Sequence, residues 1–331
     1  MTDRRRRPLW CFAFDGVQSL DVTGPWEVFA GANTTLGYDA YELRLVSPDG
    51  APISTESWLT LRTERVPDDV PGGLTLLLSG GHGARHGSRD PDLVAGVLRV
   101  AERAERILTV CTGSFWVAAA GLANGRRVAT HWNHTAELAR RFPDVDVAAD
   151  ELYVRDGELW SSAGVTSGID LALAVVEHDH GADLAQLIAR HLVMFLRRPG
   201  GQSQFATPVF TEPARTPPVQ AARQRIDTDP AGDHRLDHLA RLAGMSARHF
   251  ARCFTTEIGI TPGAYVARVR VEAARRRLEA SDATVDAIAA ECGFGTAETM
   301  RRTFHRQLGV SPDDYRSRFR LTPASTTRNT P

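Results

Sequence analysis

The chain contains one segment twice near its C-terminal end, first at residues 236–270 and again at residues 285–320. The strings SARHFARCFTTEIGITPGAY and TAETMRRTFHRQLGVSPDDY, which begin at Ser246 and Thr296, align without a gap. An internal repeat constrains a fold more than a single motif does, because both copies must form the same structural unit. Any fold for this region must therefore contain that unit twice.

Each copy predicts a short helix, a tight turn and a second helix. In the first copy the turn falls at Gly244, and the second helix starts at Ser246 and ends at Gly259, residue types that favour helix N-caps and C-caps. The equivalent residues of the second copy are Gly293, Thr296 and Gly309. The buried face of each second helix is predicted from apolar residues at i, i+4 spacing: Phe250 and Phe254, Met300 and Phe304. The pattern is that of a helix-turn-helix motif.

The opposite face of both second helices is rich in arginine. Arginine can bond guanine bidentately or hold phosphate, so this face suits the major groove of DNA. The alternative for a single copy is a solvated face on an ordinary helical bundle, and the duplication argues against it. The candidate DNA-binding residues are Arg248, His249 and Arg252 in the first copy and Glu298, Thr299, Arg301, Arg302 and Arg306 in the second.

Residues 262–279 lie between the copies and predict one continuous connecting helix. At about 1.5 Å per residue this helix spans roughly 27 Å, whereas helices in successive major grooves lie about 34 Å apart. The length of the connecting helix therefore fits a protein that places both second helices in successive major grooves of double-stranded DNA.

The strings LARLAGMSARHFARCF and IAAECGFGTAETMRRTF, closed by GVSPDDYR, resemble the AraC-type DNA-binding domain over residues 221–319. Position by position, the resemblance implies that Arg248 and Arg252 read bases from the first helix. It implies the same role for Glu298 and Arg302 in the second helix.

Charge divides the chain into two parts. All 39 basic residues are arginine; 20 of them precede residue 215 with 27 acidic residues (net −7), and 19 follow from there with 13 acidic residues (net +6). A basic part with two helix-turn-helix motifs favours a DNA-binding module joined to another domain, and 331 residues suffice for both. We expect a first domain at 8–198, a Pro- and Gly-rich linker at 199–219, a DNA-binding domain at 220–320 and a disordered tail at 321–331.

The four cysteines lie far apart in the sequence, without a C-x-x-C pair or histidines at zinc-binding spacing. We therefore expect neither disulfides nor a metal, and the sequence indicates no cofactor. Cys253 and Cys292 fall on helix positions that are predicted to be buried. There is no apolar stretch of 18 residues, so the sequence predicts a cytoplasmic protein without a membrane partner.

Strands alternate with helices in the first part of the chain. Strands are predicted at residues 9–14, 41–47, 74–79 and 107–110, and helices near residues 24–30 and 90–103. This alternation predicts a flavodoxin-like α/β domain, with a parallel sheet and helices on both faces, ahead of the all-α domain. Ligands of such sheets bind at the C-terminal ends of the strands, where Cys111 falls.

Cys111 lies between a predicted strand and a predicted helix, whose dipole favours the thiolate and a nucleophilic sulfur. The string SGGHG also follows a strand, and backbone amides of Gly80 and Gly81 can approach an oxyanion there. Together with Thr112, these residues predict a pocket at neighbouring strand ends.

The strings LDVTGPWEVF, LLLSGGHG, VCTGSF and NGRRVATHW resemble the PfpI-like branch of the class I glutamine amidotransferase-like superfamily, from residue 9 to about residue 198. The resemblance implies that Cys111 is the nucleophile, His131 the histidine after the following helix, and Asp21 the acid that faces the thiol. SSAGVTSGID and HLVMFLRRPGGQSQF resemble the stretches that precede the AraC domain in GlxA-type regulators. Asp170 in the first of these strings either approaches the pocket or caps its helix.

The intact DNA-binding module predicts a sequence-specific transcriptional regulator. Three functions remain open for the pocket. It can be a Cys-dependent enzyme for small amide, nitrile-like or aldehyde compounds, with Cys111 as nucleophile, His131 as acid/base and Asp21 as orienting group. It can sense a small-molecule effector or a redox state, or it can be a vestige that serves only dimerisation. We expect a homodimer, with RNA polymerase as a further candidate partner.

Overall fold

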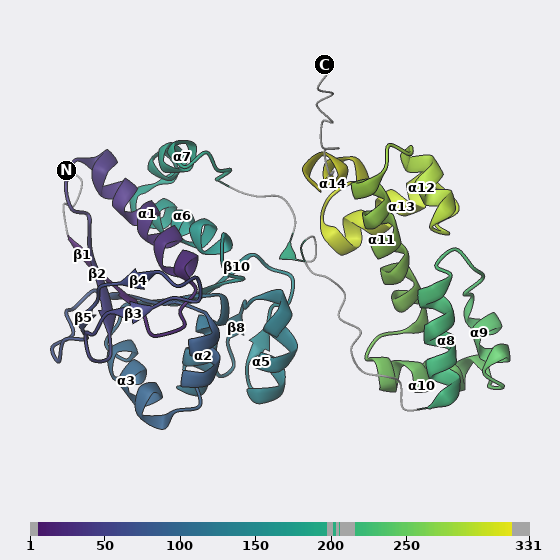
Figure 1. Cartoon of the computed structure of the whole chain (residues 1–331), viewed down its shortest axis with the longest axis horizontal. Coiled ribbons are helices and arrows are strands. Elements are labelled where there is room, and N and C mark those ends of the chain that lie inside the picture. The colour runs from purple at the N-terminus through teal and green to yellow at the C-terminus, as the bar shows by residue number, and fades with distance from the viewer. Residues whose placement is uncertain (1–5, 197–200, 203–204, 206–215, 320–331) are drawn as a thin grey trace, which may run out of the picture. The chain divides into compact units, whose positions relative to one another are not determined.

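The computed structural model describes residues 6–196, 201–202, 205 and 216–319. The chain divides into two compact units, residues 1–202 and 203–331 (Figure 1). Most of the predicted linker and all of the predicted tail lie outside the described residues. The linker's described ends belong to the units: Gln202 is buried and donates to the Thr130 and Glu151 carbonyls, and Val219 is buried in helix α8 (Pro217–Thr228).

The first unit is built on a seven-stranded sheet in the order β10-β11-β7-β6-β1-β2-β5. Neighbouring strands are parallel except for β10 and β11, which form an antiparallel hairpin. Strands β6 and β7 are buried at every residue, as expected for parallel strands that are covered on both faces. The strands are β1 (Arg7–Phe12), β2 (Tyr41–Ser47), β5 (Glu64–Arg65), β6 (Thr75–Leu78), β7 (Arg106–Val110), β10 (Tyr153–Asp156) and β11 (Leu159–Ser162).

Helices cover both faces of this sheet, which confirms the predicted flavodoxin-like fold (Figure 1). On one face α1 (Ser19–Leu36), α6 (Ser167–His180) and α7 (Ala182–His191) pack together. The other face carries α2 (His82–Gly87) and α3 (Pro91–Ala101), and α4 (Ser114–Ala119) packs against both of them. An ion pair between Arg85 and Glu137 joins α2 to α5 (Thr135–Arg141). Two short strand pairs complete the unit: β3 (Ile53–Ser54) with β4 (Thr60–Leu61), and β8 (Arg127–Val128) with β9 (Asp146–Val147).

Helix α1 begins at Ser19, earlier than the start near Gly24 that the sequence predicted. Gln18 caps it, since its side chain accepts a hydrogen bond from the Leu20 amide, and the helix continues through Pro25. The early start places Asp21 in the first turn of α1, close to the ends of the sheet strands.

Every regular element in the described part of the second unit is a helix, and the helix-turn-helix unit occurs there twice, as predicted. The first motif is α9 (Leu236–Leu242) and α10 (Ala247–Ile258), and the second is α12 (Val285–Glu291) and α13 (Ala297–Leu308). The continuous helix α11 (Pro262–Ala280) connects them and contributes to both small cores, and α14 (Pro312–Phe319) follows the second motif.

The hydrogen bonds of two buried tyrosines show that the repeat extends further upstream than the sequence alignment indicated. Tyr265 donates a hydrogen bond to Asp227 on α8, and Tyr315 donates one to Glu279 on α11. The matching strings ARQRID and ARRRLE, which start at residues 222 and 274, supply these two acidic residues. Helix α8 is therefore the counterpart of the second half of α11, and it begins within the predicted linker.

Candidate functional site

Cys111 occupies a strained position directly after strand β7. Its φ angle is +57°, in the left-handed region that side chains disfavour, and the short 3-10 helix Cys111–Gly113 leads from it into α4. The backbone around it is packed so closely that glycine is required. A Cβ on Gly80 would lie 2.7 Å from the Cys111 Cβ, and a Cβ on Gly164 would lie 2.3 Å from it.

Asp21 is fully buried next to this thiol. Its Oδ2 accepts a hydrogen bond from the Gly80 amide at 3.1 Å, and its Oδ1 accepts one from the Val165 amide at 2.9 Å. The neighbouring Cys111 thiol also favours the ionised form of the Asp21 carboxyl. Burial outweighs these bonds and raises the pKa of Asp21 to about 7.

The thiol of Cys111 is not activated in the way that the sequence predicted. Burial, followed by the charge of Asp21, raises the pKa of Cys111 well above its ordinary value. The helix dipole favours the thiolate, but the helical segment after Cys111 is short and the sulfur is removed from water, which disfavours the charged form. The resting thiol is therefore protonated at neutral pH.

The predicted oxyanion site at Gly80 and Gly81 is also not formed, because the protein itself uses both amides. The Gly80 amide donates to Asp21, and the Gly81 amide donates to the Thr112 hydroxyl at 2.8 Å. The Thr112 hydroxyl in turn donates to the Gly81 carbonyl at 3.0 Å. Thr112 thus ties the segment after β6 to the segment after β7.

His131 lies in the same pocket, half-buried, at the start of the short 3-10 helix Trp132–His134. Its Nδ1 accepts a hydrogen bond from the Asn133 amide at 3.3 Å, and burial lowers its pKa. The imidazole is therefore neutral, with its proton on Nε2. Within the described part of the chain, His131 makes no hydrogen bond to Cys111, and the acidic group that acts on the pKa of the thiol most strongly is Asp21.

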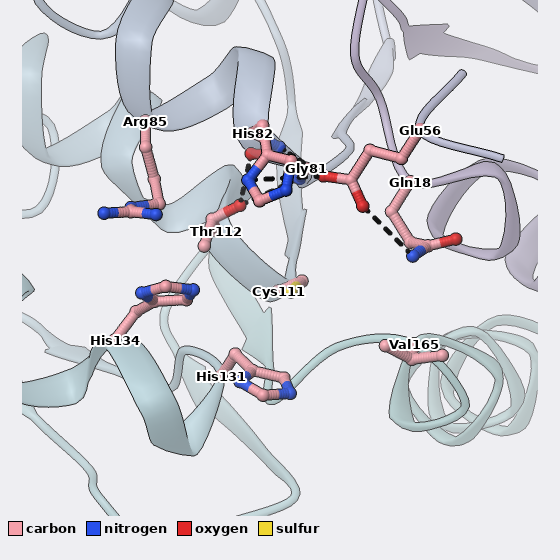
Figure 2. Close-up of a pocket in the computed structure, with 10 residues that line it drawn as sticks. All are labelled: Gln18, Glu56, Gly81, His82, Arg85, Cys111, Thr112, His131, His134 and Val165. Atoms are coloured by element: carbon pink, nitrogen blue, oxygen red, sulfur yellow. Dashed lines mark hydrogen bonds and ion pairs between the residues drawn. The ribbon is translucent and has the colours of Figure 1, made fainter. Parts of the chain in front are cut away.

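A cavity of about 150 Å³ lies above the thiol and brings in residues that the sequence did not single out (Figure 2). Besides Gly81, Cys111, Thr112 and His131, it is lined by Gln18, Glu56, His82, Arg85, His134 and Val165. His82 is the histidine of the SGGHG string and Arg85 lies two residues after the string, both on α2, so their position in the sequence carried some signal. Glu56 comes from the loop between β3 and β4, and no local pattern marks it.

Asp170 is buried in the first turn of α6 and is absent from the cavity lining. This location favours a role for Asp170 in capping its own helix over an approach to the pocket.

The DNA-binding candidates lie on the faces that the repeat predicted. The side chain of Ser246 accepts a hydrogen bond from the His249 amide at the start of α10. The side chain of Thr296 accepts one from the Thr299 amide at the start of α13. The apolar faces are buried, with Phe250, Phe254, Met300 and Phe304 all at 0% exposure. Exposed side chains occupy the other faces: Arg248, His249, Arg252, Glu298, Arg301, Arg302 and Arg306.

Three details modify the expectations for these helices. Thr299 is only half-exposed, because its hydroxyl pairs with that of Thr296 at 2.9 Å. Arg302 Nε lies 4.0 Å from the Glu298 carboxylate, so the two predicted base readers touch one another. Cys253, which was predicted to be buried, is half-buried, with its sulfur 3.6 Å from His249 Nε2.

A flavodoxin-like α/β unit with a buried thiol pocket, followed by two helix-turn-helix motifs, defines a DNA-binding transcriptional regulator. The chain belongs to the DJ-1/PfpI family, which it matches over residues 9–178, and residues 239–318 match the helix-turn-helix domain family. None of the described helices combines the length and the apolar character that a membrane span requires.

Relatives share both parts of this organisation. The chain is 39% identical over 257 residues to the HTH-type transcriptional regulator Rv1931c of Mycobacterium tuberculosis, covering 74% of this chain and 95% of that protein. It is 24% identical to the HTH-type transcriptional regulator GlxA of Rhizobium meliloti, covering 88% of this chain and 90% of GlxA. The first unit is also similar to an isonitrile hydratase of Pseudomonas putida, at 32% identity over 54% of this chain and 75% of the enzyme. The predicted GlxA-type regulator is thereby confirmed.

Proposed function

We propose that the first unit senses a small molecule at the Cys111 pocket and thereby changes the affinity of the second unit for DNA. The observation that carries this proposal is a cavity above a buried Cys111–Asp21 pair in a chain that also has two capped recognition helices. An effector shifts the balance between two arrangements of the DNA-binding units only by its different affinity for each.

For the Cys111 pocket, we favour non-covalent binding of an effector over oxidation of the thiol. Oxidation requires the thiolate, and burial together with Asp21 raises the pKa of Cys111. Redox sensing therefore requires a prior change around Cys111 that exposes the sulfur.

DNA recognition is proposed through α10 and α13 in successive major grooves. Arg248 and Arg252 on one helix and Glu298 and Arg302 on the other are the proposed base readers, since arginine suits guanine and glutamate can accept from cytosine. Arg301 and Arg306 are exposed on the same helix and are proposed to hold phosphates.

A homodimer is proposed as the working form, with RNA polymerase as a further candidate partner. Because the proposed target is DNA, we propose that the protein acts in the cytoplasm. A dimer predicts that sedimentation equilibrium of the full-length protein at micromolar concentration gives a molar mass of twice the chain mass. A monomer under those conditions would contradict this part of the proposal.

An enzyme is the second candidate, because Cys111, Asp21 and His131 surround one cavity and the isonitrile hydratase is similar to this unit. The raised pKa of the thiol and the occupied amides of Gly80 and Gly81 weigh against covalent catalysis in the resting structure. Turnover of an isonitrile by the purified protein, lost in Cys111→Ser, would establish this function.

The proposed regulator function is tested by measuring how tightly the full-length protein binds DNA from the upstream region of its own gene. Arg252→Ala should weaken specific binding by about 1–3 kcal/mol if the side chain bonds guanine. The matched control is Arg99→Ala, which removes an exposed arginine from α3 in the other unit and should leave affinity unchanged. Equal affinity of all three proteins would contradict the assignment of α10 as a recognition helix.

A further inference from the structure

The pocket above Cys111 has opposite charges on opposite sides. Figure 2 shows Arg85 and His134 on one side, Glu56 and Gln18 on the other, and Cys111 between them. The charges come from different segments, since Arg85 lies on α2 and Glu56 lies in the loop between β3 and β4. A ligand in this cavity therefore faces a cation and an anion at the same time.

The Arg85 side of the pocket carries excess positive charge. Three guanidinium groups share the carboxylate of Glu137: Arg85 lies 2.6 Å from it, Arg141 3.6 Å and Arg89 3.8 Å. Among the described residues, no other carboxylate lies within 4 Å of these arginines. His134 adds no charge, because burial and then Arg85 lower its pKa to about 4. One carboxylate against three arginines leaves room for a second anion.

The Glu56 side carries a carboxylate without a cationic partner of comparable strength. Its oxygens accept hydrogen bonds from the His82 amide and from the Gln18 side chain, which are both neutral donors. In the described part of the chain no arginine lies within 4 Å of Glu56, and the nearest ionisable nitrogen is His82 Nδ1 at 3.8 Å, on an exposed ring. This carboxylate is therefore available to a positively charged group.

The size of the cavity limits the ligand. Pockets for drug-sized molecules measure about 300–1,000 Å³, whereas this one measures about 150 Å³. We propose that the effector is a small zwitterion that directs a carboxylate toward Arg85 and an ammonium group toward Glu56, across the Cys111 thiol. The inference rests on the proposed sensor function and names the chemical class that the sensor recognises. Charge complementarity at both ends supplies specificity, because a singly charged molecule leaves one charged side unmatched.

The test is calorimetric titration of the full-length protein with unbranched ω-amino acids from glycine to 5-aminopentanoate, which scan the separation of the two charges. Carboxylates and amines of the same chain lengths are the singly charged references. At the matching length the zwitterion should bind at least about tenfold more tightly than either reference. Binding of a singly charged reference as tightly as the zwitterion at every length would overturn the inference, as would no binding of any zwitterion at millimolar concentration.

Substitutions assign each end of the ligand. Glu56→Gln should abolish the preference of the protein for the zwitterion over the carboxylate, and Arg85→Gln should abolish its preference over the amine. Arg85→Lys keeps the charge and should retain part of the preference, which separates loss of charge from loss of fold. Glu64→Gln removes an exposed acid of β5 outside the cavity lining and should change nothing. Unchanged preferences in both Gln variants of the pocket would also overturn the inference.

DNA binding measured in the same samples separates this inference from the proposed function. If a zwitterion binds with the expected pattern but leaves DNA affinity unchanged, the ligand class stands and the sensor function fails. If modification of Cys111 changes DNA affinity but no zwitterion binds, the sensor function stands and the ligand class fails.

Discussion

Asp21 should make the stability of the first unit fall as pH rises from about 4 to about 7. Its pKa is raised by burial from the ordinary value of 3.8 to about 7, so the fold favours the neutral carboxyl. The stability from this preference is fully present below pH 3.8, where both states are protonated, and is lost as pH rises through about 7. At about 1.36 kcal/mol per pH unit, the difference amounts to about 4 kcal/mol.

Asp21→Asn removes the titrating group and isolates this effect. The amide can accept only one of the two backbone N–H groups of Gly80 and Val165, so the variant should lose about 1–3 kcal/mol independently of pH. The stability of the wild-type protein relative to the variant should therefore fall by about 4 kcal/mol between pH 4 and pH 8.

Urea unfolding followed by tryptophan fluorescence measures this difference in the full-length protein. All 6 tryptophans precede residue 203, so their emission reports the first unit alone. Comparison of two proteins that differ only at Asp21 cancels the other titrating groups. Parallel stability curves for the two proteins between pH 4 and pH 8 would refute the raised pKa of Asp21.

The remaining predictions concern packing, DNA contacts and thiol access. Gly80→Ala should destabilise the first unit by about 1–3 kcal/mol, because its Cβ would lie 2.7 Å from that of Cys111. Gly96→Ala in α3, with open space around it, should stabilise by about 0.5–1 kcal/mol, and equal urea midpoints would contradict both expectations. Arg302→Ala should either weaken specific DNA binding by about 1–3 kcal/mol or reduce its salt slope by about one, measured by fluorescence anisotropy; no change in either would count against a DNA contact. Cys253, half-buried, should react with iodoacetamide before Cys111 at pH 7, and mass spectrometry showing the reverse order would contradict the burial of Cys111.

The helical unit was predictable because its signals are local and occur twice. Ser246 and Gly259 cap a helix whose apolar spacing fixes its buried face, and the second copy repeats each signal. Helix α8 was missed because its match to α11 lies 52 residues apart, whereas the main repeat is offset by 50. The Pro217-Pro218 pair also resembles a linker, although proline is well tolerated in the first turn of a helix.

The thiol pocket was predictable in position but not in its electrostatics. Strand ends place Cys111 and the glycines after β6 together, because carboxyl ends of parallel strands meet at one edge of the sheet. Whether an amide faces a ligand or an internal acceptor depends on distant residues, and Asp21 and Thr112 occupy the amides of Gly80 and Gly81. Burial of the sulfur likewise depends on the whole fold, so the local helix dipole gave the wrong direction for the pKa of Cys111. Glu56 reaches the pocket from a loop, and only the folded structure reveals it.

The central claim, that the thiol pocket controls DNA affinity, is tested most directly by DNA binding before and after alkylation of Cys111. The titration uses full-length Cys253→Ser protein, which removes the more accessible thiol, and DNA from the upstream region of its own gene. We expect complete alkylation of Cys111 to change the dissociation constant by more than about tenfold, or about 1.4 kcal/mol. A Cys111→Ser variant treated in the same way should show no change. Equal DNA affinity of the alkylated and untreated proteins would contradict the claim.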